Sequence, residues 1–212
     1  MDHDPSSLAS DMRCGPLSYD GHASTDFASR DPLTNPNVVN VIASAAGSIK
    51  ALHDGIPGIA YTPTRATELV GKECGNGVVI AHDQSWETKY CHLKERSISV
   101  KVGDTVQVGD VLGKIGLSGR TQFPHVHISV RHNGTRIDPF APSGRLTCNS
   151  SADTLWDTTI EYDAGGLLSL HFFDHLQKSK CCALVSKLHR LQTKVPQSSS
   201  QPFDLGCKKA IS

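Results

Sequence analysis

The stretch HVHISVRHNG, residues 125–134, decides the fold of this chain. Its residues alternate, so in a strand His125, His127 and Ser129 lie on one face. The three β-branched residues interleaved with them lie on the other face and predict that this side packs into a core. The two imidazoles then form a reactive face on a buried sheet. Two surface histidines on a half-exposed strand also explain so short a pattern.

A second pattern upstream, YDGHASTDF at residues 19–27, places His22 and Asp26 four residues apart. A histidine nitrogen and a carboxylate oxygen are both normal zinc ligands. Together with one histidine of the later pair they form a set of three protein ligands, and an open fourth position is the pattern of a catalytic zinc site. Taken alone, the segment reads as a polar turn after Asp-Gly.

A third pattern, YCHL at residues 90–93, adds another histidine. By strand alternation Thr88, Tyr90 and His92 share one face. A histidine that arrives from a separate strand can lie beside a metal without binding it. Such a histidine would orient water or stabilise an oxyanion.

Five separated segments, taken in order, resemble the LytM/lysostaphin-type zinc metallopeptidases that cut peptidoglycan cross-bridges. In chain order the segments are Gly21–Phe27, Gly75–His82, Tyr90–Leu93, Val100–Arg120 and Pro124–Pro139. In the same order, the family patterns that they follow are GHxxxDF, GNGVVIxH, YxHL, VKVGDxVxxGxxLGxxGxSGR and PHxHxxVRxNGxxxDP. The opening CGPLSYDGH and the two cysteines that flank GNGVVIAH resemble a proteobacterial branch of that family.

The resemblance implies an all-β domain whose antiparallel sheets form a groove and which is related to the hairpins of barrel-sandwich hybrids. It implies a zinc metalloendopeptidase that binds one Zn²⁺ per chain and acts on a peptidoglycan peptide. The implied zinc ligands are His22, Asp26 and His127. His92 and His125 fall on the two catalytic positions that do not bind the metal; one takes the proton of water and the other stabilises the oxyanion, and the resemblance leaves open which does which.

Two features depart from the family pattern. Ser24 stands where the family usually has glycine, and Ala28–Leu33 does not continue as the family does. Serine is a mild change in a loop that must pass close to the metal, and the departure at Ala28–Leu33 concerns the wall of the groove, so the five chemical positions stay intact.

Short apolar runs separated by Gly, Asp or Asn predict a sandwich or barrel-like all-β domain. The predicted strands are Val78–His82, Thr88–His92, Ile98–Val102, Val106–Val108, Val111–Leu117 and Val126–Arg131. Val38–Leu52 is expected to hold one or two more. A Val-Gly-Asp triplet recurs at residues 102–104 and 108–110, and each Gly-Asp predicts a turn.

Two other functional classes compete with an enzyme. The stretch VKVGDTVQVGDVLGKIG also resembles the hairpins of lipoyl- and biotinyl-carrier domains, but Lys101 and Lys114 lie within predicted strands and lack the flanks of an attachment site. The second alternative is a non-catalytic LytM-type regulator of a cell-wall amidase. Such regulators have usually lost zinc ligands, whereas this chain keeps all of them.

The amino-acid composition limits the classes of partner and the cellular compartment that we expect for this chain. The 21 basic and 21 acidic residues give a formal charge of zero, so no nucleic-acid footprint is present. No run approaches the roughly 18 apolar residues of a membrane span, and no signal peptide follows Met1. The seven cysteines nevertheless fit an oxidising compartment. We expect a periplasmic or secreted protein of a Gram-negative bacterium whose export signal is missing from this sequence; a cytosolic protein with free thiols is the alternative.

We expect three regions: a polar N-terminal arm at 1–18, the metallopeptidase domain at 19–142, and a linker with a basic tail at 143–212. Lys178–Lys194 predicts an amphipathic cationic helix, which either holds the enzyme near anionic polymers or is an accidental, poorly ordered end. Cys74 and Cys91 flank a predicted hairpin and are expected to form a disulfide, and Cys14 with Cys148 is a second candidate pair.

Overall fold

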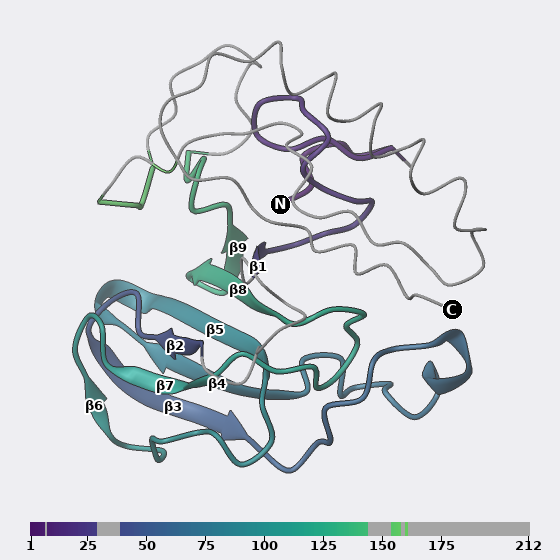
Figure 1. The fold of residues 1–212 in the computed structure, drawn as a ribbon. Coiled ribbons are helices and arrows are strands. Elements are labelled where there is room, and N and C mark those ends of the chain that lie inside the picture. Colours follow the sequence, from purple (N-terminus) through teal and green to yellow (C-terminus); the bar gives the residue numbers. More distant parts are fainter. Residues whose placement is uncertain (7, 29–38, 144–153, 158–159, 161–212) are drawn as a thin grey trace, which may run out of the picture. The chain divides into compact units, whose positions relative to one another are not determined.

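A computed structural model describes residues 1–6, 8–28, 39–143, 154–157 and 160 (Figure 1). Contacts divide the chain into two units, 1–166 and 167–212, and all described residues belong to the first. The predicted tail helix at Lys178–Lys194 and the expected disulfide partner Cys148 lie outside the described residues. None of the described segments forms a helix with the length and apolarity that a membrane crossing requires.

The described part of the chain is built from antiparallel strands, which confirms the all-β prediction. Two single 3₁₀ turns, Pro63–Arg65 and Asp83–Ser85, are its only described helical elements. The strands are β1 (Thr25–Ala28), β2 (Asn40–Ile42), β3 (Gly47–His53), β4 (Asn76–Ala81), β5 (Trp86–Leu93), β6 (Thr105–Val106), β7 (Val111–Lys114), β8 (His125–His132) and β9 (Thr135–Ile137).

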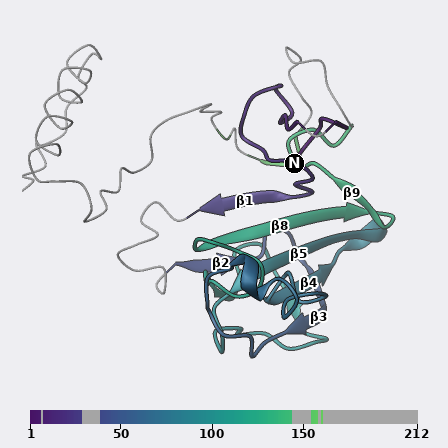
Figure 2. The same cartoon turned by 90° about the vertical axis from the view of Figure 1, so that its right-hand side faces the viewer.

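One sheet carries most of these strands, in the order β1-β8-β5-β4-β3-β6, with β9 paired to β8. Figure 2 shows β1, β8, β5, β4 and β3 following one another across this sheet. A second, two-stranded sheet joins β2 to β7. Strands β1, β8 and β5 are therefore neighbours, although they come from opposite ends of the domain sequence.

The core confirms the alternation predicted for residues 125–134. Val126, Ile128 and Val130 of β8 are at most 8% exposed and belong to the apolar cluster between the sheets. The cluster also contains residues of the neighbouring strands and loops, namely Val41, Ala43, Ile49, Val78, Ile80, Tyr90, Leu93, Val106, Leu112 and Ile115. The opposite face of β8 is thereby free to carry polar side chains.

Most predicted strands are present, and Val38–Leu52, which was expected to hold one or two strands, contains β2 and all of β3 except its last residue, His53. The strand predicted at Ile98–Val102 is wrong. The Ser99 N–H does donate to the Leu112 carbonyl of β7, but the Lys101 N–H donates to Asp104 Oδ2 instead of to a strand, and the segment does not continue as a strand. Strands β1 and β9 were not predicted, because three or four residues carry too little alternation to be recognised.

The two Val-Gly-Asp triplets form matching turns, as predicted. Asp104 Oδ2 accepts the Lys101 N–H at 2.8 Å, and Asp110 Oδ2 accepts the Gln107 N–H at 2.7 Å. The glycine before each aspartate has a positive φ, 93° and 88°, which explains why glycine occupies both positions.

The described residues of the N-terminal segment 1–18 contain turns and bends and no strand. Carboxylates organise it: Asp11 accepts the backbone N–H groups of Gly15 and Leu17. His3 Nε2 lies 2.6 Å from Asp138 Oδ2, which follows β9. This contact fixes the segment to the sheet close to the edge strand β1.

Candidate metal and catalytic centre

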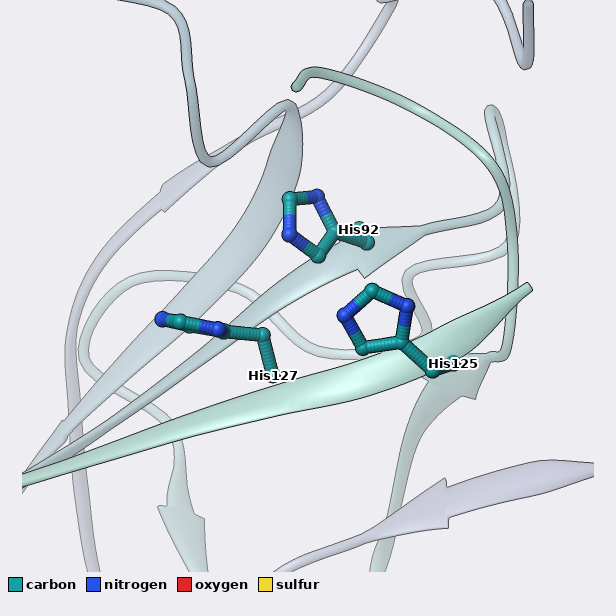
Figure 3. A group of neighbouring side chains, drawn as sticks. All are labelled: His92, His125 and His127. Carbon is teal, nitrogen blue, oxygen red and sulfur yellow. The ribbon is translucent and has the colours of Figure 1, made fainter. Parts of the chain in front are cut away.

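The polar face of the sheet gathers all five candidate residues. Asp26 on β1 lies opposite His127 on β8, and Cys91 on β5 lies opposite the same His127. His22 precedes β1, and His92 follows Cys91 directly. The rings of His92, His125 and His127 converge (Figure 3), with centroids 4.9 Å apart for His92–His125 and 5.5 Å for His92–His127.

The predicted ligand set forms one compact group. His127 Nδ1 lies 2.8 Å and His22 Nε2 lies 3.2 Å from Asp26 Oδ1. His22 is 7% exposed, and its Nε2 makes no hydrogen bond within the described residues. Ligand atoms around a tetrahedral zinc are about 3.3 Å apart. The donor types, the close approach and the buried nitrogen without a hydrogen-bond partner therefore fit a zinc ion.

A second group overlaps the first. One nitrogen from each of His92, His125 and His127 also lies within 4.8 Å of the others. The two groups share His127, so geometry alone allows two different metal triads.

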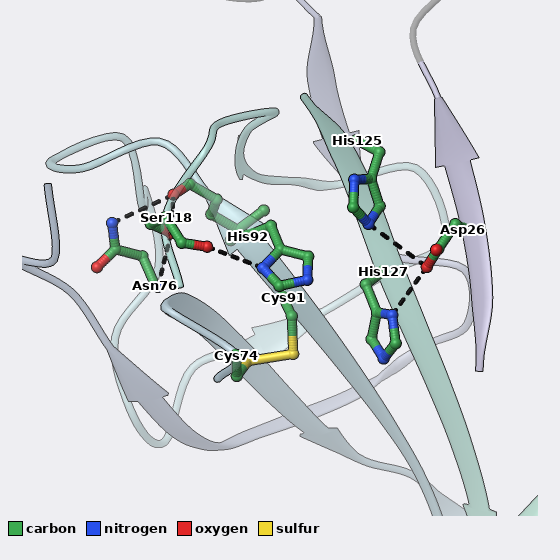
Figure 4. Close-up of a disulfide and its surroundings, with 9 residues drawn as sticks. Asp26, Cys74, Asn76, Cys91, His92, Ser118, His125 and His127 are labelled. Carbon is green, nitrogen blue, oxygen red and sulfur yellow. Dashed lines mark hydrogen bonds and ion pairs between the residues drawn. A yellow bond between two sulfur atoms is a disulfide. The ribbon is translucent and has the colours of Figure 1, made fainter. Parts of the chain in front are cut away.

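The Asp26 carboxylate is the electrostatic centre of the site (Figure 4). Burial raises its pKa, but the imidazoles of His125, His127 and His22, each with a ring nitrogen within 3.5 Å of Oδ1, outweigh this effect and hold the pKa far below its usual range. Asp26 is therefore a carboxylate, surrounded by three imidazoles, and it contributes a full negative charge to the first group.

His92 corrects the sequence analysis. The predicted alternation placed Tyr90 and His92 on one face, but Tyr90 is fully buried in the core while His92 lies in the groove beside Cys91. His92 has a left-handed φ of 64°, which breaks the alternation and turns the side chain back. Its backbone N–H donates to the Cys74 carbonyl at 2.8 Å and stabilises this conformation.

Both catalytic candidates are oriented through Nδ1. His92 Nδ1 donates to the Ser118 carbonyl at 2.8 Å, and His125 Nδ1 donates to the Phe123 carbonyl at 2.9 Å. Because a carbonyl only accepts, each Nδ1 carries the proton, and each Nε2 has a lone pair in the neutral ring. The pKa of His92 is lowered to about 4, chiefly by burial and next by the charge of nearby His125. His92 is therefore neutral near pH 7.

Residues 35–139 match the sequence profile of Peptidase family M23. The chain contains a peptidase M23 domain. The matched range includes His92, His125 and His127, whereas His22 and Asp26 precede it. Their assignment to the same centre rests on the strand pairing and the distances given above.

Curated relatives of the M23 domain include the peptidoglycan DD-endopeptidase ShyC of Vibrio cholerae, 40% identical over 65 residues. The DD-carboxypeptidase/endopeptidase Mpg of Neisseria meningitidis is 35% identical over 108 residues. These alignments cover 31% and 45% of this chain but only 14% and 24% of the relatives. The chain thus spans less than a quarter of the length of either relative.

Solved structures that are similar to this chain include two M23 proteins. The catalytic domain of the prophage-encoded M23 protein EnpA from Enterococcus faecalis is 24% identical, with a TM-score of 0.45 and coverage of 61% of this chain and 84% of that one. A peptidase M23 structure from Pseudomonas aeruginosa is 29% identical, with a TM-score of 0.44, and the match covers 69% of this chain and 54% of that one.

The M23 domain also uses residues that sequence reasoning missed. Asn76 is fully buried, and its Nδ2 donates to the carbonyls of Ile56 and Leu93. Ser118 Oγ accepts the Asn76 N–H and donates to the Leu93 carbonyl. This network fixes the Ser118 carbonyl that orients His92. The available signal was a polar residue inside the apolar run GNGVVI.

A disulfide closes the same corner of the M23 domain. Cys74 and Cys91 are bonded, with Cα atoms 4.8 Å apart, as predicted (Figure 4). Cys14 is disulfide-bonded as well, whereas Cys148, its expected partner, lies outside the described residues.

Replacing both Cys74 and Cys91 by serine is expected to lower the free energy of unfolding by about 3 kcal/mol, the chain-entropy value for a loop of this size. The crosslinked residues are 17 positions apart. Urea denaturation of the double variant and of the unaltered protein under non-reducing conditions measures the difference. An unchanged midpoint and slope would show that the disulfide does not stabilise the M23 domain.

Proposed function

We propose that this chain is a zinc-dependent endopeptidase that hydrolyses peptide bonds in the cross-links of bacterial peptidoglycan. The observation that carries the proposal is the convergence of His22 Nε2, Asp26 Oδ1 and His127 Nδ1 beside two further oriented histidines. Membership of the domain in a peptidase family, and relatives described as peptidoglycan endopeptidases, support the reaction and the substrate class.

The proposed zinc ligands are His22, Asp26 and His127. This triad is preferred over the three-histidine group because it contains the carboxylate and the buried nitrogen that lacks a hydrogen bond. Zinc supplies Lewis acidity, which polarises a carbonyl and lowers the pKa of a water molecule. A metal held by only three protein ligands keeps room for the reacting groups.

His92 and His125 are the proposed proton-transfer and oxyanion-stabilising groups. Each presents an Nε2 lone pair toward the centre, so one of them accepts the proton of the attacking water. The other, once its Nε2 has taken up a proton from solvent, donates a hydrogen bond to the oxyanion that forms on the scissile carbonyl. Their Nδ1 bonds to backbone carbonyls hold both rings at a fixed angle during these steps.

The domain bounds and the cellular location are part of the same proposal. Residues 19–142 form the proposed peptidase domain, and the chain acts in the periplasm or outside the cell. The Cys74–Cys91 disulfide and the peptidoglycan endopeptidases among the relatives support this location, since disulfides persist in oxidising compartments.

Digestion of purified cross-linked muropeptides tests the proposal. We expect release of monomers with one new amino terminus, loss of the reaction with a chelator, and recovery when zinc is added back. His53, an exposed histidine on β3, provides a matched control: His53→Ala should cut at the normal rate. A protein that binds no zinc and cuts no cross-link, but stimulates a cell-wall amidase, would instead be a regulator.

A further inference from the structure

Three of the basic side chains that line the same groove as the proposed catalytic centre lie on neighbouring strands. They are Lys89 of β5, Arg131 of β8 and Arg136 of β9. None of them forms an ion pair with a described residue. Glu73 is the acidic residue that raises the pKa of Lys89, and its carboxylate accepts the Gly71 N–H at 2.9 Å and is thereby held on its own loop. Glu87, which lies opposite Arg131 on β5, forms its ion pair with Lys50 and so leaves Arg131 without an acidic partner among the described residues.

Strand register places these cations in line with the proposed zinc site. His127, Ser129 and Arg131 alternate along one face of β8, and Lys89 lies opposite Ser129. Arg136 lies opposite Arg131 on the other side. With a rise of about 3.4 Å per residue, Ser129 is about 7 Å and Arg131 about 14 Å from His127 along the strand.

The cations are close together and partly shielded from water. Lys89 is half-buried, and its pKa is lowered first by burial and then by the charges of Arg131 and Arg136. Arg131 is also half-buried, and its Nε has no hydrogen-bond partner. Holding like charges together in this way is unfavourable unless an anion completes the cluster.

Ser129 gives a second, independent indication of a ligand. Its side chain is 6% exposed, it lines the groove, and its Oγ makes no hydrogen bond within the described residues. Buried hydroxyl groups are normally paired. A hydroxyl donor between the zinc site and the cations would bind the same anion that neutralises them.

We propose that Lys89, Ser129, Arg131 and Arg136 form a subsite for a carboxylate of the peptide substrate. The proposal rests on the proposed function, because the anion is assigned to the substrate of the same groove. An extended peptide rises about 3.3 Å per residue, so the carboxylate would belong to a residue roughly two to four positions from the scissile bond. Peptidoglycan stem peptides contain acidic residues, and guanidinium groups bind carboxylates through two parallel hydrogen bonds.

The test compares two substrates in the full chain: a cross-linked muropeptide with free carboxylates, and the same fragment with its carboxyl groups amidated. We expect kcat/KM to be about 10-fold to 100-fold higher for the carboxylate form, mainly through KM, as for charge-assisted hydrogen bonds. Lys89→Gln and Arg131→Gln should each reduce this preference by about 10-fold. Lys101→Gln, an exposed lysine outside the groove, should retain it.

The variants at the half-buried residues Lys89 and Arg131 could fail to fold. Arg136 is exposed, so Arg136→Gln should fold, and it should still reduce the preference for the carboxylate form. Calorimetric binding of both fragments to His92→Ala separates this proposal from the proposed function. A binding preference for the carboxylate form without hydrolysis by the unaltered chain would support the subsite and overturn the peptidase activity. Equal binding of the two fragments, or the same preference in the Lys89, Arg131 and Arg136 variants as in Lys101→Gln, would overturn the subsite.

Discussion

Zinc binding is expected to weaken at least tenfold when Asp26 is replaced by alanine, and hydrolysis is expected to disappear with it. Loss of a group that merely supports a metal ligand typically costs about 10-fold to 100-fold in affinity, so loss of a ligand costs no less. Asp26 is also the carboxylate that contacts His22, His125 and His127. Competition with a chromogenic chelator measures the zinc dissociation constant of each variant.

Asp26→Ala also distinguishes the two overlapping triads. His127 belongs to both, so His127→Ala would lose metal under either assignment. Asp26 belongs only to the first triad and His92 only to the second. Asp20→Ala, which removes an exposed carboxylate from the same segment, serves as the control. Full zinc affinity in Asp26→Ala, together with weakened affinity in His92→Ala, would assign the metal to the three histidines.

The fold was predictable where the alternation of apolar and polar residues was long enough to indicate which side chains are buried. The alternation of residues 125–134 and the Gly-Asp turns at 103–104 and 109–110 agree with the structure. The segment Ile98–Val102 misled because Ile98 and Val100 do pack against the core, as strand residues would. The Ser99 N–H donates to Leu112 of β7, but the Lys101 N–H donates to the Asp104 carboxylate instead of to a strand, and hydrophobicity does not indicate that bond.

The candidate site was predictable in composition but not in geometry. Motif order selected the five residues that the structure brings together. It could not show that His92 leaves the strand pattern, because a left-handed histidine is stabilised by tertiary contacts with Cys74 and Ser118. The grouping of Lys89, Arg131 and Arg136 could not be predicted from the sequence either, because it depends on the pairing between β5, β8 and β9.

Single replacement of His92 or His125 by alanine is expected to lower turnover by roughly 10²-fold to 10⁴-fold while zinc stays bound. This range is the usual contribution of a positioned acid, base or oxyanion donor. Both rings are at most 6% exposed, and both are held through Nδ1 by backbone carbonyls. Such anchoring suits groups that transfer protons through Nε2. Metal content and single-turnover rate are measured on the same samples.

The matched comparison is with His53→Ala, which removes an exposed imidazole from β3 and should change neither quantity. A rate close to normal in both His92→Ala and His125→Ala would show that these rings only fill space beside the metal. Loss of zinc in both would make them ligands and would overturn the division between binding and catalysis. A large rate loss with zinc retained in both variants would support this division, because two separate imidazoles would then act on the reaction without binding the metal.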